Sequence, residues 1–178
     1  SNKDALDGAK QILMELFAEN SVLLKELREY LWRNAYLKST VMPKKEKEGI
    51  KFSDYFEHHE AFKSIPSHRT LALLRGRNES ILSLQMVSNL ELINDEKASD
   101  PCLGMIAQQF NIQDQKRAAD SWLQQVVLWT WKIKLHLYLE TELLTRVREE
   151  AEAEAIRIFA KNLSDLLMAA PAGPKITM

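Results

Sequence analysis

The sequence predicts a mainly α-helical protein: a multi-helix bundle with one long helical element and a small two-stranded β ribbon. Apolar residues recur at spacings of three and four between residues 4 and 34, as on the buried stripe of an amphipathic helix. Residues 120–168 contain neither glycine nor proline and are rich in Leu, Ala, Glu and Trp, which favours a long helix. Residues 36–42 and 80–87 instead alternate apolar and polar side chains, which is typical of strands.

Length and composition limit the class of protein. The chain has 178 residues, of which 46% are hydrophobic and 28% charged, enough to bury the core of one domain, and this excludes intrinsic disorder. One cysteine excludes a disulfide framework. The longest apolar stretch, residues 121–131, is far shorter than the roughly 20 residues of a membrane span, and no secretory signal opens the chain. We therefore expect a soluble, cytoplasmic protein without a membrane partner.

The first elements are two helices. Asp4 or Asp7 can cap the first helix, and Asn20 or Ser21 can cap the second, which ends near Asn34. We expect the two to form a helical hairpin.

A mixed region follows. After residues 36–42, the first predicted strand, a charged loop leads to a short helix over residues 53–60. Pro66 suits the first turn of the next helix, which we expect Gly76 to end. The second strand, residues 80–87, is expected to pair with the first.

The C-terminal half is dominated by helix. Residues 89–100 are interpreted as a loop and residues 101–110 as a helix. Residues 120–168 form either one helix of about 70 Å or two helices joined by a bend. The first half of this segment is apolar on nearly every side, so we expect it to be buried on several faces, whereas the second half has a single apolar stripe.

The ends of the chain indicate a piece of a longer protein. Residues 1–3 contain no initiator methionine and are interpreted as a tag remnant or linker. Residues 4–170 are interpreted as one helical region. Residues 171–178 contain Pro and Gly after the last helix and are interpreted as a linker toward a further domain.

Charge is unevenly distributed along the chain. Residues 25–77 hold 12 Lys and Arg against 7 Asp and Glu, although the whole chain has a net charge of −1. Aromatic residues interleave this basic tract, so it could follow a phosphate backbone and offer stacking surfaces. An ordinary solvated surface explains the same surplus, because five charges over this length are few. The candidate nucleic-acid-binding residues are Lys44, Lys45, Lys47, Arg69, Arg75 and Arg77.

The clustered residues that could bind a metal ion surround His58 and His59. Adjacent side chains on a helix point about 100° apart, so these two cannot share one metal ion as an i, i+4 pair does. We assign His58, His59 and His68 to structural or interface contacts, and Glu79 to pairing with nearby arginines. Cys102 has no neighbouring base, and no glycine-rich phosphate loop occurs. We therefore expect no catalytic residue, no metal, no cofactor and no enzyme activity.

Trp129 and Trp131 lie in the apolar first half of the long segment, where they could be mistaken for a ligand-binding box. At this spacing in an apolar helix they are typical of a core, or of a face that meets another domain. We interpret both as structural or interface residues.

Several short motifs occur in an order that identifies a family. They are DGAKQILME at 7–15, YLWRNA at 30–35, FSDYFEHHE at 52–60, PSHRTLA at 66–72, LRGRNE at 74–79, LETEL at 139–143 and DLLMAAPAG at 165–173. In this order they closely resemble the Tex family of bacterial transcription accessory proteins. The resemblance covers nearly the whole chain and is weakest over residues 89–118.

The resemblance implies a place for this region in a longer protein. Tex-like proteins have a helical segment before it. After it they have an RNase H-like domain of YqgF type, helix-hairpin-helix modules and an RNA-binding OB-fold domain. Residues 171–178 would then lead to the RNase H-like domain. The implied partners are nucleic acid, bound mainly by the other domains, and the transcription machinery.

We therefore expect a non-catalytic helical scaffold in which residues 120–168 dock on the RNase H-like domain, while the basic tract faces nucleic acid or RNA polymerase. Two alternatives stay open. Residues 4–34 could form a DNA-binding helix-turn-helix, although Glu26 and Glu29 on the second helix argue against it. The chain could also be a fragment of a metal-dependent nuclease with a metal at His58 and His59.

Overall fold

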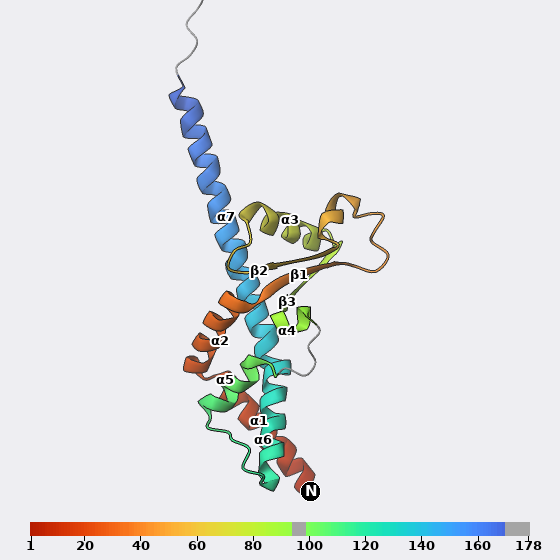
Figure 1. Cartoon of the computed structure of the whole chain (residues 1–178), viewed down its shortest axis with the longest axis vertical. Coiled ribbons are helices and arrows are strands. Elements are labelled where there is room, and N and C mark those ends of the chain that lie inside the picture. Colours follow the sequence, from red (N-terminus) through yellow and green to blue (C-terminus); the bar gives the residue numbers. More distant parts are fainter. Residues whose placement is uncertain (94–98, 170–178) are drawn as a thin grey trace, which may run out of the picture.

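One long helical element organises the molecule (Figure 1). The computed structural model describes residues 1–93 and 99–169. Helix α6 (Ala118–Trp129) continues through a π-helical segment (Thr130–Leu135) into helix α7 (His136–Met168) without a break. The element is therefore one helix of about 75 Å rather than two joined by a bend. The prediction of a mainly α-helical fold with one long helical element is confirmed.

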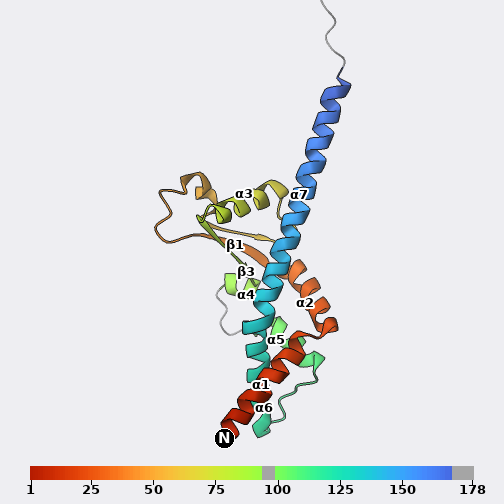
Figure 2. The same ribbon diagram turned by 180° about the vertical axis from the view of Figure 1, so that it is seen from behind.

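Three shorter helices lie along the lower half of this element in Figure 1: α1 (Asn2–Ala18), α2 (Ser21–Asn34) and α5 (Pro101–Gln109). Asn20 caps α2, because its side chain accepts a hydrogen bond from the Leu23 amide at 2.8 Å. Helix α1 packs on α6 and the π-helical segment, whereas α2 packs on α5 and α7. The predicted hairpin is wrong, because α1 and α2 pack very little on each other and instead pack on different parts of the long helix (Figures 1 and 2).

The predicted loop at 89–100 begins with a short helix, α4 (Asn89–Leu92), which the Ser88 side chain caps. The helix predicted after this loop is confirmed as α5, and the Asp100 carboxylate caps it by accepting from the Cys102 amide at 2.9 Å. Residues 94–98 of the predicted loop and the predicted linker at 171–178 lie outside the described residues.

The sheet has three strands rather than two. Strand β1 (Tyr36–Val41) lies between β2 (Glu57–Ala61) and β3 (Leu82–Val87), and both pairings are antiparallel. The predicted pairing of the first and last of these segments is confirmed, with Tyr36 opposite Val87. The β1–β3 pair is thus the ribbon that the alternating patterns indicate, and β2 extends it on the other side of β1.

The third strand occupies the place of a predicted helix. The helix expected over residues 53–60 is wrong: a 3₁₀ helix (Ile50–Tyr55) ends there and the chain is extended from Glu57. Strand β2 places His58 opposite Ser39 and His59 opposite Lys38 on β1. Its sequence, EHHEA, has no apolar alternation, so pairing with β1 supplies the strand conformation that the local pattern does not signal.

Helix α3 (Ser67–Asn78) covers one face of the sheet and packs against α7 (Figures 1 and 2). Gly76 lies inside this helix, so the prediction that it ends the helix is wrong. A Cβ atom at Gly76 would lie 2.4 Å from Cδ1 of Leu82 on β3. The close approach of α3 to β3, rather than a helix end, therefore accounts for glycine at this position.

The buried positions of the long helix run from the lower helices to the sheet. Because four residues exceed one helical turn of 3.6, a stripe that recurs every fourth residue drifts around the helix. Such a stripe can face α1 and α5 below and α3 above, and it joins both regions into one core. Its members are Val127, Trp131, Leu135, Leu139, Leu143, Val147 and Ala151.

One side of the long helix is exposed, so the prediction of burial on several faces is wrong for the residues Trp129, Ile133, Leu137 and Tyr138, which are 42–62% exposed. Lys10 of α1 lies over the Trp129 ring but leaves this side chain 42% exposed. The far half of α7 projects beyond α3 (Figures 1 and 2). It carries an exposed apolar stripe, here called the α7 stripe, formed by Ile156, Phe159, Leu163, Leu166 and Leu167. No helix within the described residues is long and apolar enough to cross a membrane.

Candidate nucleic-acid interface

The candidate nucleic-acid-binding residues lie on two segments: the loop that joins β1 to the 3₁₀ helix, and helix α3. The loop holds Lys44, Lys45 and Lys47, and α3 holds Arg69, Arg75 and Arg77. The 3₁₀ helix packs against α3, so the fold connects the two segments through this contact.

Carboxylates of the chain neutralise half of these cations. Lys45 pairs with Glu48 at 2.5 Å, and Arg69 pairs with Glu60 at 2.5 Å. Arg75 donates to Glu79 at 2.9 Å. These pairs reduce the charge that the two segments offer to a phosphate backbone.

Glu79 receives a second cation, because Lys51 of the 3₁₀ helix lies 2.5 Å from its other carboxylate oxygen. Hydrogen bonds from Lys51 and then Arg75 hold the pKa of the Glu79 carboxyl below its usual range. Glu79 therefore stays ionised and ties the end of α3 to the 3₁₀ helix.

A groove of about 320 Å³ between α3 and α7 brings three arginines together: Arg75, Arg77 and Arg148. Glu79 and Glu152 also line this arginine groove. Within residues 1–93 and 99–169, no carboxylate lies within the 4.0 Å ion-pair distance of Arg77 or Arg148. Guanidinium groups that keep their donors available can bind phosphate oxygens in pairs of hydrogen bonds. The arginine groove is thus better suited to an anion than the paired cations Lys45, Arg69 and Arg75.

Arg148 is not among the residues that the sequence singles out. It precedes the acidic run at 149–154, and local composition therefore marks its segment as negative. Only the packing of α3 on α7 brings it beside Arg77. No signal in a single sequence reveals that contact.

The two adjacent histidines point to opposite faces of the sheet, because successive side chains of a strand alternate. His58 Nε2 lies 3.1 Å from Glu60 Oε2, and its ring meets that of Tyr55 edge-on. His59 is exposed and lies edge-on to Tyr36. His58 and His59 therefore cannot ligate one metal ion together.

His68 occupies the first turn of α3 and is exposed. Among the described residues, no three His, Cys, Asp or Glu side chains gather as a metal site would require. Glu60, which could have served as a ligand, instead links His58 on β2 to Arg69 on α3. This link ties β2 to α3.

The two tryptophans have different surroundings. Trp131 is buried, and its ring meets His136 edge-on with 5.4 Å between the ring centres. Trp129 is 42% exposed, and Lys10 Nζ lies 4.5 Å from its ring centre. Trp131 thus contributes to the core, and Trp129 belongs to the exposed side of the long helix.

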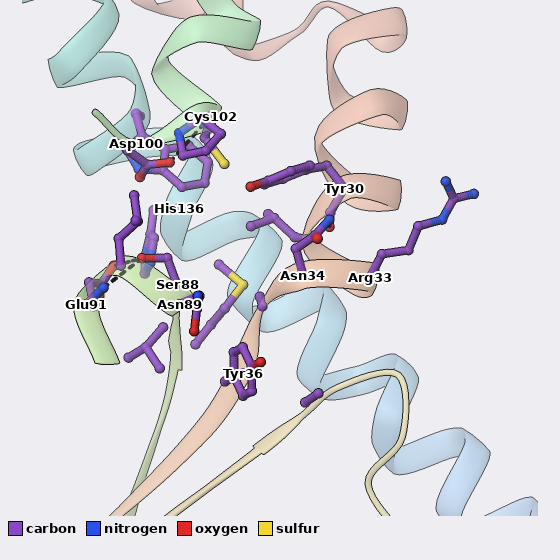
Figure 3. A pocket seen from close by; sticks show the side chains of 18 residues that line it. Tyr30, Arg33, Asn34, Tyr36, Ser88, Asn89, Glu91, Asp100, Cys102 and His136 are labelled. Carbon is purple, nitrogen blue, oxygen red and sulfur yellow. Dashed lines mark hydrogen bonds between the residues drawn. The ribbon is translucent and has the colours of Figure 1, made fainter. Parts of the chain in front are cut away.

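Trp131 and His136 also line a cavity of about 340 Å³ at the junction of α2, the sheet, α4 and α5 (Figure 3). Cys102 is buried in its wall. Burial, and then the charge of Asp100, raise the pKa of the Cys102 thiol, which favours the protonated thiol over the nucleophilic thiolate.

Helices α1 and α2, the pair considered as a DNA-binding helix-turn-helix, pack on different neighbours. One face of α2 is buried through Leu23, Leu27 and Leu31. Arg28 on another side of α2 is bound by Glu142 of α7. The helix that would have to enter a DNA groove therefore has one of its cations bound to α7.

Comparison with known proteins places these features in context. The chain matches the family described as Tex central region-like over residues 1–159. It is 53% identical over 176 residues to Protein YhgF of Escherichia coli and 45% identical over 181 residues to Protein tex of Bordetella pertussis. It is also 44% identical over 176 residues to Transcriptional accessory protein Tex of Neisseria gonorrhoeae. Each alignment covers 99% of this chain and 23% of the relative, so the chain spans about a quarter of the length of these relatives.

Proposed function

The chain belongs to the Tex family, and from this premise we propose that it is a non-catalytic helical scaffold of a transcription accessory protein, whose arginine groove contacts nucleic acid. The name of the Neisseria gonorrhoeae relative supports the role in transcription. A bacterial protein with this role acts in the cytoplasm, where nucleic acid and RNA polymerase are its partners.

The arginine groove is the observation that carries the nucleic-acid contact. Arg77 of α3 and Arg148 of α7 line the same groove. Lys44 and Lys47 add positive charge on the loop that joins β1 to the 3₁₀ helix. A few guanidinium and ammonium groups of this kind supply weak, salt-dependent affinity for a phosphate backbone without reading sequence. The groove is therefore proposed as an accessory contact, with the main recognition left to the other domains of the protein.

The α7 stripe supports the scaffold role. Side chains such as Phe159, which is 68% exposed, leave a contiguous apolar face on a helix that projects from the rest of the molecule. An apolar face of this size on one side of a helix is typical of a surface that packs against another element. We assign it to the RNase H-like domain that the resemblance places after this region, so that the long helix holds that domain at a fixed distance from the sheet.

The structural contacts of the residues that could carry chemistry support the absence of a catalytic role. His58, Glu60 and Arg69 form one structural link between β2 and α3. Cys102 is buried and protonated, and Asp100 beside it caps α5. In each case a structural contact explains the residue.

Fluorescence anisotropy with labelled single-stranded RNA and duplex DNA tests the nucleic-acid contact. We expect binding by this chain at about 50 mM salt that weakens steeply at about 200 mM, because counterions compete for phosphates. The double variant Arg77→Ala, Arg148→Ala should lower the slope of log affinity against log salt by about one for each phosphate that it no longer binds.

Arg157→Ala is the matched control, because Arg157 is an exposed arginine of α7 that pairs with Glu154 outside the arginine groove. It should leave the affinity unchanged. A loss of log affinity in the control that is half the loss in the double variant would mean that only net charge matters, because the control removes one cation and the double variant removes two. No binding at low salt would remove the nucleic-acid contact and leave the scaffold role alone.

A further inference from the structure

The cavity beside the π-helical segment is a partly enclosed site that the proposed function does not use. Its volume of about 340 Å³ lies at the lower end of the range of about 300–1,000 Å³ for small-ligand sites, which suits a single side chain. Its wall is assembled from the end of α2, the first residue of β1, the end of β3 with α4, the start of α5, and the π-helical segment with the start of α7.

The wall carries negative charge. Two carboxylates line the cavity, Asp100 before α5 and Glu91 on α4. One oxygen of Asp100 accepts from the Cys102 amide, and Glu91 is near Ser88, whose hydroxyl lies 3.4 Å from its Oε1. Both hydrogen bonds come from neutral groups, so neither bond neutralises the negative charge of a carboxylate.

The end of a helix adds to this negative character, and the guanidinium among the lining residues points away from the cavity. Helix α2 ends at the cavity, and the carbonyl end of a helix carries a partial negative charge. Arg33 also lines the cavity, but Figure 3 shows its guanidinium pointing away from the space that Asp100 and Cys102 border. A cation entering the cavity therefore meets acceptors first.

Four aromatic rings also line the cavity: Tyr30, Tyr36, Trp131 and His136. In Figure 3 the ring of Tyr30 extends from α2 toward Cys102. Burial raises the pKa of Tyr30, so its hydroxyl stays uncharged and available for hydrogen bonds. The faces of such rings attract a cation, and a guanidinium can stack on them as well.

The π-helical segment is a second feature that marks this place. It spans Thr130–Leu135 and contributes Trp131 to the cavity wall, and His136 follows directly after it. Wide turns of this type are uncommon inside α-helices and are frequent at functional sites.

We propose that this cavity receives an arginine side chain from a protein partner, with the guanidinium between the tyrosine and tryptophan rings and its donors directed to Asp100 and Glu91. The chemistry favours arginine over a nucleotide, because the same carboxylates repel phosphate. It favours arginine over lysine, because a planar guanidinium can stack on an aromatic ring and donate hydrogen bonds to a carboxylate at the same time. The site is independent of the arginine groove, which binds the opposite charge.

The test uses the 178-residue chain and nuclear magnetic resonance titration with N-acetyl-arginine amide. The neutral probe N-acetyl-citrulline amide has nearly the same shape and serves as the chemical control. We expect the arginine probe to shift the amides of residues 88–91, Asp100 and Cys102 and to bind at least about fivefold more tightly than citrulline. Uridine monophosphate is the third probe and should leave these amides unchanged.

The informative variants keep the fold. Asp100→Asn removes the charge but retains a good helix cap, and Glu91→Gln removes the second charge. Each should weaken the arginine probe about threefold or more, whereas Asp54→Asn, an exposed carboxylate on the 3₁₀ helix, should not change it. Equal binding of arginine and citrulline, unchanged affinity in both cavity variants, or stronger binding of uridine monophosphate would each overturn the proposal.

Discussion

Arg28 of α2 and Glu142 of α7 form a two-point ion pair that joins the N-terminal helices to the long helix. The Arg28 Nε and Nη2 atoms both donate to the Glu142 carboxylate, Nη2 at 3.1 Å, and both side chains are one-third exposed. One turn further along α7, the guanidinium carbon of Arg146 lies 3.7 Å from the ring centre of Trp32. Charge and aromatic contacts thus hold α2 on α7 in addition to apolar packing.

The Arg28–Glu142 pair should contribute measurably to stability. In a double-mutant cycle with Arg28→Gln and Glu142→Gln, urea unfolding should show a coupling free energy of about 0.5–1 kcal/mol, the upper range for partly exposed pairs, because the geometry is bidentate. The coupling should shrink at high salt. The exposed pair of Arg146 and Glu150 on α7 is the comparison and should couple by less than about 0.5 kcal/mol. A coupling of zero for the first pair would contradict this account.

Gly76→Ala should destabilise the protein. The new Cβ would lie 2.4 Å from Leu82 Cδ1 and 2.8 Å from its Cγ, so α3 or β3 must move, at a cost of about 1–3 kcal/mol that the better helix propensity of Ala offsets only in part. Gly104→Ala is the matched control, because it lies in α5 with no atom within 4 Å of the added Cβ. That substitution should stabilise the protein by roughly 0.5–1 kcal/mol. Thermal unfolding of both variants measures the difference, and equal shifts would refute the close contact.

Asp120 should make the free energy of unfolding depend on pH. Its buried carboxylate accepts hydrogen bonds from the amides of Gln115 and Arg117 at 2.8 and 2.9 Å and from the Arg117 guanidinium at 3.0 Å. The bond from the Arg117 amide, followed by that from its side chain, lowers the pKa of Asp120. A lowered pKa stabilises the folded state above the unfolded value of about 3.9, and this contribution disappears as the pH falls through the folded value.

Asp120→Asn should therefore be less stable than the parent chain at pH 7, and the difference should narrow below about pH 4. Urea midpoints at about pH 7, 5 and 3 measure it. Asp54→Asn, at an exposed carboxylate, should show little difference at any of these values. A gap for Asp120→Asn that stays constant with pH would show that the charge of the carboxylate does not matter.

The α7 stripe should become protected when its proposed partner is present. Arg157 and Lys161 are exposed on the projecting half of α7, so trypsin should cut there in this chain. In a longer chain that adds the RNase H-like domain, cleavage at these two sites should slow by about tenfold or more, as expected when local opening becomes costly. Equal cleavage in the two chains would argue against docking.

Cys102 should resist alkylation in the folded state. It is 1% exposed, and burial raises the pKa of its thiol, so few molecules present a thiolate to the reagent. We expect reaction with iodoacetamide at about pH 8 only as fast as the protein opens, and complete reaction in urea. Fast labelling of the folded chain would show that the cavity wall around Cys102 opens freely.

Local sequence predicts the elements whose own residues favour one conformation. The β1–β3 pair follows from an apolar period that every pleat repeats, and the long helix follows from its composition and its lack of Gly and Pro. Strand β2 escapes prediction because EHHEA has no such period and gains its conformation from β1. Gly76 is misleading because glycine is common at helix ends, whereas here it admits Leu82, a residue whose position beside α3 depends on the tertiary fold.

The candidate interface is predictable only in part, because local sequence does not show which distant segments come into contact. The basic tract stands out in the composition, but the carboxylates that neutralise Arg69 and Arg75 become visible only when β2 and the end of α3 are placed. Arg148 reaches the groove through packing of α3 on α7. The cavity draws on elements from several parts of the chain, and no segment of the sequence alone contains enough of its wall to reveal it.

The π-helical segment also determines where the chain can change its length. A wide turn holds one residue more than an α-helical turn, so deletion of the exposed Lys132 should convert it to regular helix and leave Leu139 facing the core. Deletion of the exposed Thr141 in α7 would instead rotate every following residue by about 100°. A single-residue deletion is thus tolerable at this turn. Trp131 and His136 line the neighbouring cavity, so deletion of Lys132 would change the shape of that cavity. The rest of the helix would keep its orientation toward the core.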